Sequence, residues 1–390
     1  MVKEKVLSIR DLSIAFKTSS GLVSAVRGVN LDLYKGETLA IVGESGSGKT
    51  VTVKTIMGIL SNNGKIKSGT IEYTYEENGQ KTTKNLLDYS KKEMRKKING
   101  KHIAMVFQDP MTSLDPTMNI GNQIMEGMRI HYKTPKKEAY AKALELLELV
   151  GITDAEARMS NYPHQLSGGM RQRIVIAIAL ASDPDVLICD EPTTALDVTI
   201  QAKILELIQS IQQKTGISVI YITHDLGVVA KVADHVNVMY AGRIVETGTV
   251  NEVFYEPRHP YTWGLLLAMP DLETKADKLE SIPGNPPNLE HEVVGDPFAP
   301  RNPYALNIDH RLEPPMFQIS ETHSAATWLL AEEAPACPPP AELLERIERM
   351  KKEDERYVGT EETDTIREEL KAALQSESEV YGESSGWSFI

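Results

Sequence analysis

A glycine-rich segment between a short apolar run and a helix-forming stretch constrains this chain more than any other feature. The segment is Gly43-Glu-Ser-Gly-Ser-Gly-Lys-Thr50, which fits the pattern G-x-x-x-x-G-K-[ST]. The apolar run at residues 39–42 is typical of a buried strand, and residues 49–60 are typical of the helix that follows it. A strand, a loop and a helix in this order predict an α/β domain that binds phosphate groups.

Each residue type in this loop suits a bound triphosphate. Glycine lets the backbone wrap closely round phosphates. The loop N–H groups and the positive end of the next helix together form an anion-binding site. Lys49 is expected to reach the terminal phosphates, and the Thr50 hydroxyl to bind Mg²⁺. The alternative, a glycine-rich turn without function, is disfavoured by the complete pattern, so binding of ATP or GTP is predicted. The residues assigned to the nucleotide are Gly43, Glu44, Ser45, Gly46, Ser47, Gly48, Lys49 and Thr50.

Two carboxylates follow a second apolar run. Residues 186–189 show no alternation, which is typical of a parallel strand covered on both faces, and Asp190 and Glu191 come directly after them. Open α/β sheets bind ligands at this end of their strands. Asp190 is therefore the predicted magnesium carboxylate beside Thr50, and Glu191 the predicted general base for the attacking water. Acidic residues after a strand are often only solvated charges, but the phosphate loop upstream reverses that preference.

A histidine ends the next apolar run. His224 follows residues 217–223 and lies 33 positions after Glu191, which leaves room for one helix at 199–214 between two parallel strands. A lone histidine in such a place is more often structural than catalytic. Its position after a third strand nevertheless favours a contact with the γ-phosphate.

The segment Leu166-Ser-Gly-Gly-Met170 provides a second candidate anion site. Ser167 is a good N-cap residue, Gly168 and Gly169 permit close backbone approach, and residues 171–181 are rich in helix formers. The result is a helix N-terminus suited to binding an anion. The phosphates that this chain itself binds are already assigned to the loop at residues 43–50. We therefore expect the phosphate to be delivered by another molecule.

These segments, together with Gln108, occur once each and in a fixed order within the first 225 residues. In this the chain resembles the ATPases of ATP-binding-cassette (ABC) transporters. Segments 107–116, 162–173, 259–263 and 282–287 further resemble the D-type ATP-binding subunit of oligopeptide permeases. The resemblance implies a P-loop NTPase cassette of class α/β, with a RecA-like core sheet, an antiparallel β subdomain, a helical subdomain and a peptide-permease-type C-terminal extension.

The resemblance also implies roles for residues that the patterns alone do not assign. In this family two cassettes pack head to tail. The signature segment of each cassette, which corresponds to residues 166–170 here, covers the nucleotide bound by the other cassette. Gln108 would sense magnesium and water, and Ser167, Gly168 and Gly169 would contact ATP held by the partner. Asp197, in Ala195-Leu-Asp197, would communicate across the dimer. Phe16, which ends an alternating run, stands where the family stacks an aromatic ring on adenine, although an aromatic residue on a strand is usually part of the core.

Three domains are expected along the chain. Residues 1–250 form the cassette, with antiparallel strands at 6–16, 23–33 and 70–75 and a helical insert at 118–181. Residues 251–335 form an irregular, proline-rich extension packed against it. Residues 336–390 form an acidic tail, because residues 341–390 hold 14 Asp and Glu against 7 Lys and Arg. Helical stretches at 341–355 and 365–375 contain few apolar residues, so this tail is predicted to be partly helical and partly mobile.

The extension departs from the family in one respect. Many relatives carry four cysteines there for an iron–sulfur cluster, whereas alignment by eye places Asp296, Asn302, Asp309 and Thr327 at these positions. Without thiolates no cluster is expected. These side chains could suggest a site for a hard cation. We favour the other interpretation, in which they are polar loop residues that preserve the fold.

Composition restricts the cellular context. Two cysteines, Cys189 and Cys337, exclude a disulfide framework and fit a reducing compartment. The sequence shows neither a leader nor about 18 consecutive apolar residues, so no membrane span is predicted. A net charge of −13 argues against a nucleic-acid partner. The resemblance implies a place at the cytoplasmic face of the membrane, beside two transmembrane permease subunits and a paralogous ATP-binding subunit, in a heterodimer, with an extracytoplasmic peptide-binding protein acting indirectly.

The predicted function is ATP hydrolysis, with ATP and Mg²⁺, that energises the import of oligopeptides. Two alternatives remain open. The same subfamily includes dipeptide and nickel importers, and an ATPase subunit does not touch the cargo. A soluble cassette protein of translation or DNA repair belongs to a different class. Such proteins usually carry two cassettes or a long coiled-coil insertion, and this sequence shows neither.

Overall fold

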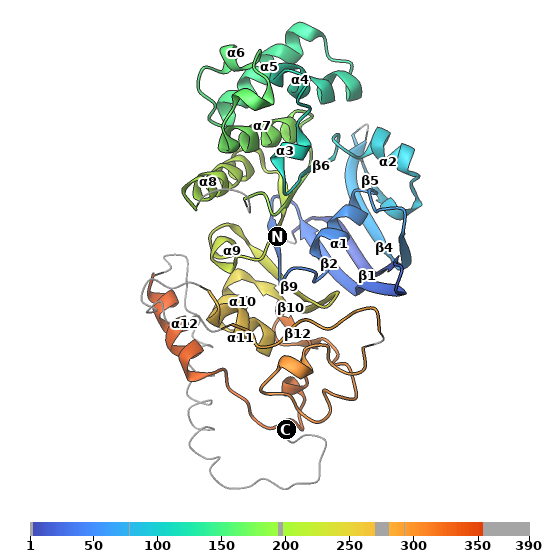
Figure 1. Cartoon of the computed structure of the whole chain (residues 1–390), viewed down its shortest axis with the longest axis vertical. Coiled ribbons are helices and arrows are strands. Elements are labelled where there is room, and N and C mark those ends of the chain that lie inside the picture. Colours follow the sequence, from blue (N-terminus) through green and yellow to red (C-terminus); the bar gives the residue numbers. More distant parts are fainter. Residues whose placement is uncertain (1–2, 78, 194–197, 270–280, 292, 354–390) are drawn as a thin grey trace.

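The computed structural model describes residues 3–77, 79–193, 198–269, 281–291 and 293–353. An eight-stranded sheet occupies the middle of the molecule, with a helical insert (green) at one end and the C-terminal extension (orange) at the other (Figure 1). A four-stranded antiparallel sheet (blue) lies beside the core sheet. Within the described residues no helix is both long and apolar enough to cross a membrane.

The antiparallel sheet has the strand order β2-β1-β4-β5. Its strands are β1 (Lys5–Lys17), β2 (Leu22–Tyr34), β4 (Gly64–Glu77) and β5 (Gln80–Asn85). The three predicted strands are confirmed, and β4 is longer than expected. The sequence did not indicate β5, because this edge strand is polar (QKTTKN) and has no buried face.

The core sheet has the order β11-β12-β10-β9-β3-β8-β7-β6. Its parallel strands are β3 (Thr38–Val42), β6 (Ile103–Val106), β7 (Val186–Asp190), β8 (Ser218–Thr223) and β9 (His235–Tyr240). The antiparallel strands are β10 (Arg243–Thr249), β11 (Phe317–Gln318) and β12 (Ser324–Ala325). The last two belong to the C-terminal extension, which therefore extends the core sheet itself.

The parallel strands are buried on both faces, as their continuous apolar runs predicted. In β7, Val186 and Ile188 belong to one hydrophobic cluster and Leu187 and Cys189 to another. Successive residues of a strand point to opposite faces, so the two clusters lie on opposite sides of the sheet. The cluster with Val186 and Ile188 joins the sheet to the antiparallel sheet, and the cluster with Leu187 and Cys189 joins it to the helical insert.

The helices that cover the core sheet are α1 (Lys49–Ile56), α8 (Val198–Thr215) and α9 (Leu226–Val232). Helix α1 is shorter than the predicted stretch 49–60. Gly58 adopts a left-handed conformation (φ 64°), and its N–H donates to Thr55 O at 3.0 Å. This hydrogen bond ends the helix, and the glycine at this place was the sequence signal for the earlier end.

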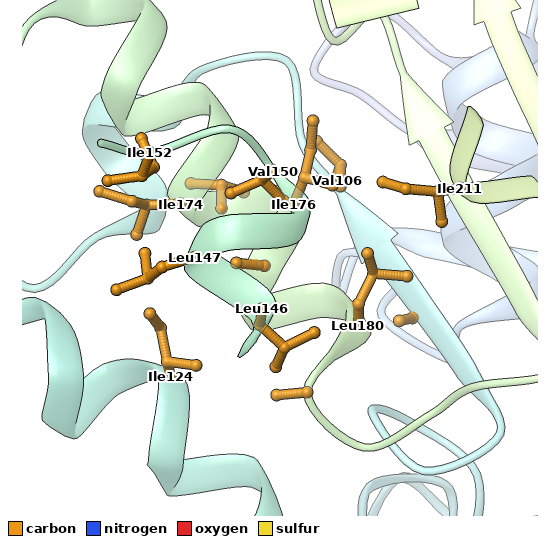
Figure 2. Close-up of a cluster of buried hydrophobic side chains, with 14 of the residues drawn as sticks. Val106, Ile124, Leu146, Leu147, Val150, Ile152, Ile174, Ile176, Leu180 and Ile211 are labelled. Atoms are coloured by element: carbon orange, nitrogen blue, oxygen red, sulfur yellow. The ribbon is translucent and has the colours of Figure 1, made fainter. Parts of the chain in front are cut away.

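The helical insert comprises α3 (Pro110–Ser113), α4 (Ile120–His131), α5 (Lys136–Leu149), α6 (Ala155–Arg158) and α7 (Gly168–Leu180). Figure 2 shows its core, in which Ile124 of α4, Leu147 of α5 and Ile174 of α7 gather. Helix α7 also packs against β6, so the insert is joined to the strand that leads to Gln108. The remaining short elements before the extension are η1 (Leu86–Asp88), α2 (Lys91–Lys97) and η2 (Pro163–Gln165).

The C-terminal extension contains α10 (Val250–Tyr255), α11 (Pro260–Leu267), η3 (Ala299–Arg301) and η4 (Trp328–Leu330), and α12 (Ala341–Glu353) follows in the tail. The predicted helix near 341–355 is confirmed as α12, which buries Leu343 and Ile347 in a cluster with α10 and α11. Arg346 donates to the carbonyls of Leu267 and Met269 at the end of α11. The predicted helix at 365–375 lies outside the described residues.

A buried carboxylate joins this extension to β10. Glu246 is fully buried and accepts hydrogen bonds from the N–H groups of Arg258 (2.7 Å) and His259 (3.1 Å). It also lies 2.8 Å from Nε2 of His323, which is 1% exposed. One side chain of the core sheet thus holds two separate segments of the extension.

Replacing Glu246 by alanine should detach these segments. The change leaves two backbone N–H groups and one imidazole without an acceptor in the interior, so the free energy of unfolding should fall by on the order of 3 kcal/mol. Urea unfolding of the full chain measures this change. The matched control is Glu321→Ala, which removes an exposed carboxylate from the same extension and should leave stability unchanged. Equal stability of the two variants would contradict the role of Glu246.

Candidate functional site

The phosphate loop connects β3 to α1 and presses closely on its neighbours. Gly43 (φ 148°) lies so near β9 that a Cβ atom there would stand 2.1 Å from Met239 O. Gly48 (φ 107°) leaves only 2.6 Å between such an atom and Ala25 O of β2. Any side chain at these positions would push the loop away from both strands, which explains the glycines of the motif.

Lys49 is held inside this loop and is only 4% exposed. Its Nζ donates to Gly43 O (2.7 Å) and Glu44 O (2.9 Å) and lies 3.4 Å from the Ser47 hydroxyl. Burial lowers the pKa of Lys49, while the charges of Glu191, Asp190 and Glu44 oppose this shift. The loop therefore positions an ammonium group where a phosphate can replace the carbonyls as its acceptor.

Thr50 and Asp190 meet across the site, as predicted. The Thr50 hydroxyl donates to Oδ1 of Asp190 at 2.8 Å, and Asp190 is 4% exposed at the end of β7. Burial raises the pKa of Asp190, although the Thr50 hydrogen bond opposes the shift. A buried carboxylate beside a hydroxyl provides two oxygen ligands and needs a cation to offset its desolvation. These residues fit Mg²⁺, which Thr50 and Asp190 would hold.

Gln108, Glu191 and His224 converge from three neighbouring strands. Each comes just beyond the carboxyl end of its strand: β6, β7 and β8, respectively. Nε2 of Gln108 donates to Oε2 of Glu191 at 3.2 Å, and Nδ1 of His224 lies 3.5 Å from the same oxygen. The Glu191 side chain is 16% exposed and His224 56%, so the carboxylate is sheltered and the imidazole faces solvent.

Glu191 also has an unusual backbone. Its φ of 47° is in the left-handed region, which a non-glycine residue rarely adopts, and its N–H donates to Ile222 O at 3.0 Å. Strain of this kind persists where the surroundings fix it and occurs often at functional sites. The backbone thus directs the Glu191 side chain toward Gln108 and His224.

Asp225 supports this arrangement, and the sequence analysis missed it. Its Oδ1 accepts from the N–H groups of Gly227 (2.9 Å) and Val228 (3.4 Å), so it caps α9 directly after His224. The signal was present in the sequence, since an aspartate before an apolar stretch is a common N-cap.

The signature segment has the predicted local structure. Ser167 is the N-cap of α7, and its hydroxyl accepts from the Met170 N–H at 3.3 Å. Ser167 and Gly168 are exposed, and a Cβ atom on Gly169 would stand 3.0 Å from Cγ2 of Ile200. The helix therefore begins at Gly168 rather than near residue 171, and its start is exposed at Ser167 and Gly168. The contact of these residues with a partner's ATP stays a prediction.

The structure describes only one of the two remaining assigned residues, Asp197 and Phe16. Asp197 lies outside the described residues. Phe16 is half-buried near the end of β1, packs against the cluster beneath the antiparallel sheet, and lies against Gly64. Part of its ring therefore has the core role that an aromatic residue on a strand commonly takes, and its contact with adenine stays a prediction.

The four polar residues of the extension are all buried and act as turn-forming acceptors. Asp296, Asn302 and Thr327 each accept a hydrogen bond from the N–H two residues ahead, at 3.0, 2.9 and 3.3 Å. Asp309 accepts from Leu306 N–H at 2.6 Å. These contacts agree with their interpretation as polar loop residues that preserve the fold.

The fold and the site together define a P-loop nucleotide-binding cassette, and comparison with known families agrees. Residues 26–194 match the family model of the ABC transporter, and residues 245–308 match that of the oligopeptide/dipeptide transporter C-terminal region. The dipeptide transport ATP-binding protein DppD of Lactococcus lactis subsp. cremoris is 54% identical over 350 residues, which are 90% of this chain and 98% of that protein. The oligopeptide transport ATP-binding protein OppD of Bacillus subtilis is 55% identical over 348 residues, 89% and 95% of the two chains. The chain belongs to the ABC transporter family, in its branch of oligopeptide and dipeptide transport ATP-binding proteins.

Solved structures support the cassette fold. The chain is similar to a dimeric structure of the ATP-binding cassette MJ0796 bound to ADP and Pi, with a TM-score of 0.53 and 26% identity over 63% of this chain and 98% of that one. It is also similar to cbiO1 from Clostridium perfringens, part of an ABC transporter complex, with a TM-score of 0.54 and 32% identity over 65% and 92% of the chains. Both likenesses leave about a third of this chain uncovered.

The buried Asp296 predicts a pH dependence of stability. Burial, together with the Asp309 and Glu313 charges, raises its pKa to about 7, and the Phe298 N–H opposes the shift. Because this pKa is above the ordinary value of 3.8, the folded state binds the proton more tightly than the unfolded state. The stability gained from the proton is complete below about pH 4 and is lost as the pH rises through about 7.

Asp296→Asn should remove this dependence while keeping the acceptor for Phe298. Between pH 5 and pH 8 the native protein should lose up to about 2 kcal/mol more stability than the variant. Urea unfolding at the two pH values measures the difference. Glu37, whose pKa burial also raises to about 7, is present in both proteins and cancels in the comparison. Parallel stability losses in the two proteins would show that Asp296 does not titrate as described.

Proposed function

We propose that this chain is the ATP-hydrolysing subunit of an ABC importer of oligopeptides. The observation that carries this proposal is the position of Glu191, whose carboxylate lies within 3.5 Å of both Gln108 and His224. The same strand supplies Asp190, which lies beside Thr50 of the phosphate loop. One edge of the sheet thus carries a base, a hydrogen-bond donor and a cation-binding site. This combination supports hydrolysis of a phosphate anhydride.

The residues divide the reaction among them. Lys49 and the loop N–H groups bind the phosphates, and Glu191 takes a proton from the water that attacks the γ-phosphorus. Gln108 orients the carboxylate of Glu191 by its hydrogen bond, and His224 donates to the γ-phosphate. Thr50 and Asp190 would hold Mg²⁺, which would supply positive charge opposite the phosphate oxygens. The products are ADP and inorganic phosphate.

The proposed partners follow from exposed surfaces. The N-terminus of α7 at Ser167 is exposed and suits an anion, and we assign it to ATP on a paralogous ATP-binding subunit. A groove that shares Thr50, Gln108 and Asp190 with the site supports contact with two transmembrane permease subunits at the cytoplasmic face of the membrane. Its lining is Thr50, Lys54, Met105, Phe107, Gln108, Asp109, Thr112, Ser113, Val175, Ile178, Ala179 and Asp190. Phe107, at 38% exposed, offers an apolar surface next to Gln108. An extracytoplasmic peptide-binding protein would act only through these permease subunits.

Dipeptides are the second candidate cargo. The relatives support both, since one is a dipeptide transport protein at 54% identity and another an oligopeptide transport protein at 55%. In cells whose uptake of a labelled pentapeptide depends on this chain, an excess of unlabelled pentapeptide should compete strongly. Stronger competition by an equal excess of a dipeptide would favour the dipeptide candidate.

Replacing Glu191 by glutamine tests the chemistry. The change removes the base but keeps the side chain's size, so ATP should still bind while the turnover number falls by on the order of 10²-fold or more. Phosphate release by the purified assembly measures turnover, and equilibrium binding of ATP measures the site. Glu206→Gln is the matched control, because it makes the same change at an exposed carboxylate of α8 and should preserve activity. Turnover that survives in Glu191→Gln would exclude Glu191 as the base.

A further inference from the structure

A side chain of the C-terminal extension pairs with the phosphate loop. Glu44 follows Gly43 in the loop, and both its carboxylate oxygens bind Arg301 at the end of η3, with N–O distances of 2.7 and 2.9 Å. The Arg301 side chain is 4% exposed and that of Glu44 30%. Two parallel hydrogen bonds between opposite charges form one of the strongest and most directional contacts available to side chains. This pair therefore fixes the direction of the Glu44 side chain.

A second contact joins the extension to the main chain of the same residue. The N–H of Glu44 donates to the hydroxyl of Tyr261 at 2.9 Å, and Tyr261 is fully buried in α11. Glu44 is thus held both through its side chain and through its peptide group. Both contacts come from the extension rather than from the cassette.

Arg301 and Tyr261 are themselves firmly placed. Nε of Arg301 donates to Pro283 O at 2.8 Å, and Nη1 lies 3.2 Å from the hydroxyl of Tyr240 on β9. The ring of Tyr261 lies 4.6 Å from that of Tyr240 and 5.3 Å from that of Phe298, centroid to centroid. Aromatic packing and backbone acceptors therefore hold the two residues before they contact the loop.

The contacts continue from Glu44 to the phosphate-binding lysine. The carbonyl of Glu44 accepts from Nζ of Lys49 at 2.9 Å, and the adjacent carbonyl of Gly43 accepts at 2.7 Å. The Gly43 carbonyl belongs to the same peptide group as the Glu44 N–H that donates to Tyr261, so a movement of this group would displace an acceptor of Lys49. The position of the Lys49 ammonium group therefore depends on how Glu44 is held.

We propose that Arg301 and Tyr261 are positioning residues of the nucleotide site, through which the docked C-terminal extension holds Glu44 and, by way of Glu44, Lys49. The inference rests on the proposed function in taking the loop to bind ATP. Arg301 stands 257 positions after Glu44, so a separate part of the chain sets the affinity of the loop for phosphates. Neither residue touches the reacting atoms.

The competing explanation is that these contacts only dock the extension. Docking alone would change stability and leave nucleotide affinity unaltered. The two explanations therefore differ in the dissociation constant for ATP and in how a loss of activity divides between KM and kcat. Lys49 binds the phosphates before and during the reaction, so misplacing it should raise KM more than it lowers kcat.

Four variants of the full chain test the proposal, with a fluorescent ATP analogue and MgCl₂ as the probe. Arg301→Gln should weaken binding by roughly 10-fold or more, and Arg301→Lys, which keeps one charged contact, by less. Tyr261→Phe retains the packed ring and should weaken binding by roughly threefold. Arg243→Gln is the control, because the Arg243 side chain forms a similar ion pair to the extension (Nη1 to Glu313 Oε1, 2.7 Å) with a carboxylate outside the phosphate loop; it should bind as the native chain does.

Each outcome decides the question. Native affinity in folded Arg301→Gln and Tyr261→Phe would overturn the proposal and leave docking as their role. If Arg301→Gln does not fold, Tyr261→Phe alone decides, since it loses only a hydroxyl. Failure of the native chain and of Arg243→Gln to bind the analogue would instead overturn the proposed function, and the positioning role with it. In the assembled ATPase, kcat/KM for Arg301→Gln should fall mainly through KM.

Discussion

The structure depends on one feature of the core sheet: its adjacent parallel strands all have their carboxyl ends at the same edge. Strands β3, β8, β7 and β6 are adjacent and point the same way, so the phosphate loop, His224, Glu191 and Gln108 emerge together. Burial of these strands on both faces fixes them, because a shift of any one would expose apolar side chains in two clusters. The geometry of the site is therefore a consequence of how the core packs.

The C-terminal extension is part of this construction. It adds two short strands to the core sheet and is held by the buried carboxylate of Glu246. Through Arg301 and Tyr261 it also contacts the phosphate loop at Glu44. A region that follows the cassette in sequence thus contacts the phosphate loop directly. The extension can therefore influence the site although it contributes no reacting group.

Sequence reasoning located residues that stand at the ends of apolar strands. Asp190 and Glu191 could be assigned because residues 186–189 are apolar and parallel strands end at one edge, and Lys49 because the phosphate-loop pattern is local in the sequence. Strand β5 could not be found, because an exposed edge strand needs no apolar pattern. The Glu44–Arg301 pair was also invisible, since two charges 257 positions apart leave no local signal. The end of α1 at Ile56 was predictable from Gly58, and the longer prediction overlooked it.

Uptake of a labelled pentapeptide by cells that lack this chain tests the central claim most directly. The cells would be complemented with the native chain or with Glu191→Gln at equal expression. The account predicts that only the native chain restores uptake, because transport requires the hydrolysis that Glu191 supports. Equal uptake with either chain, or with neither, would contradict a peptide importer driven through this site.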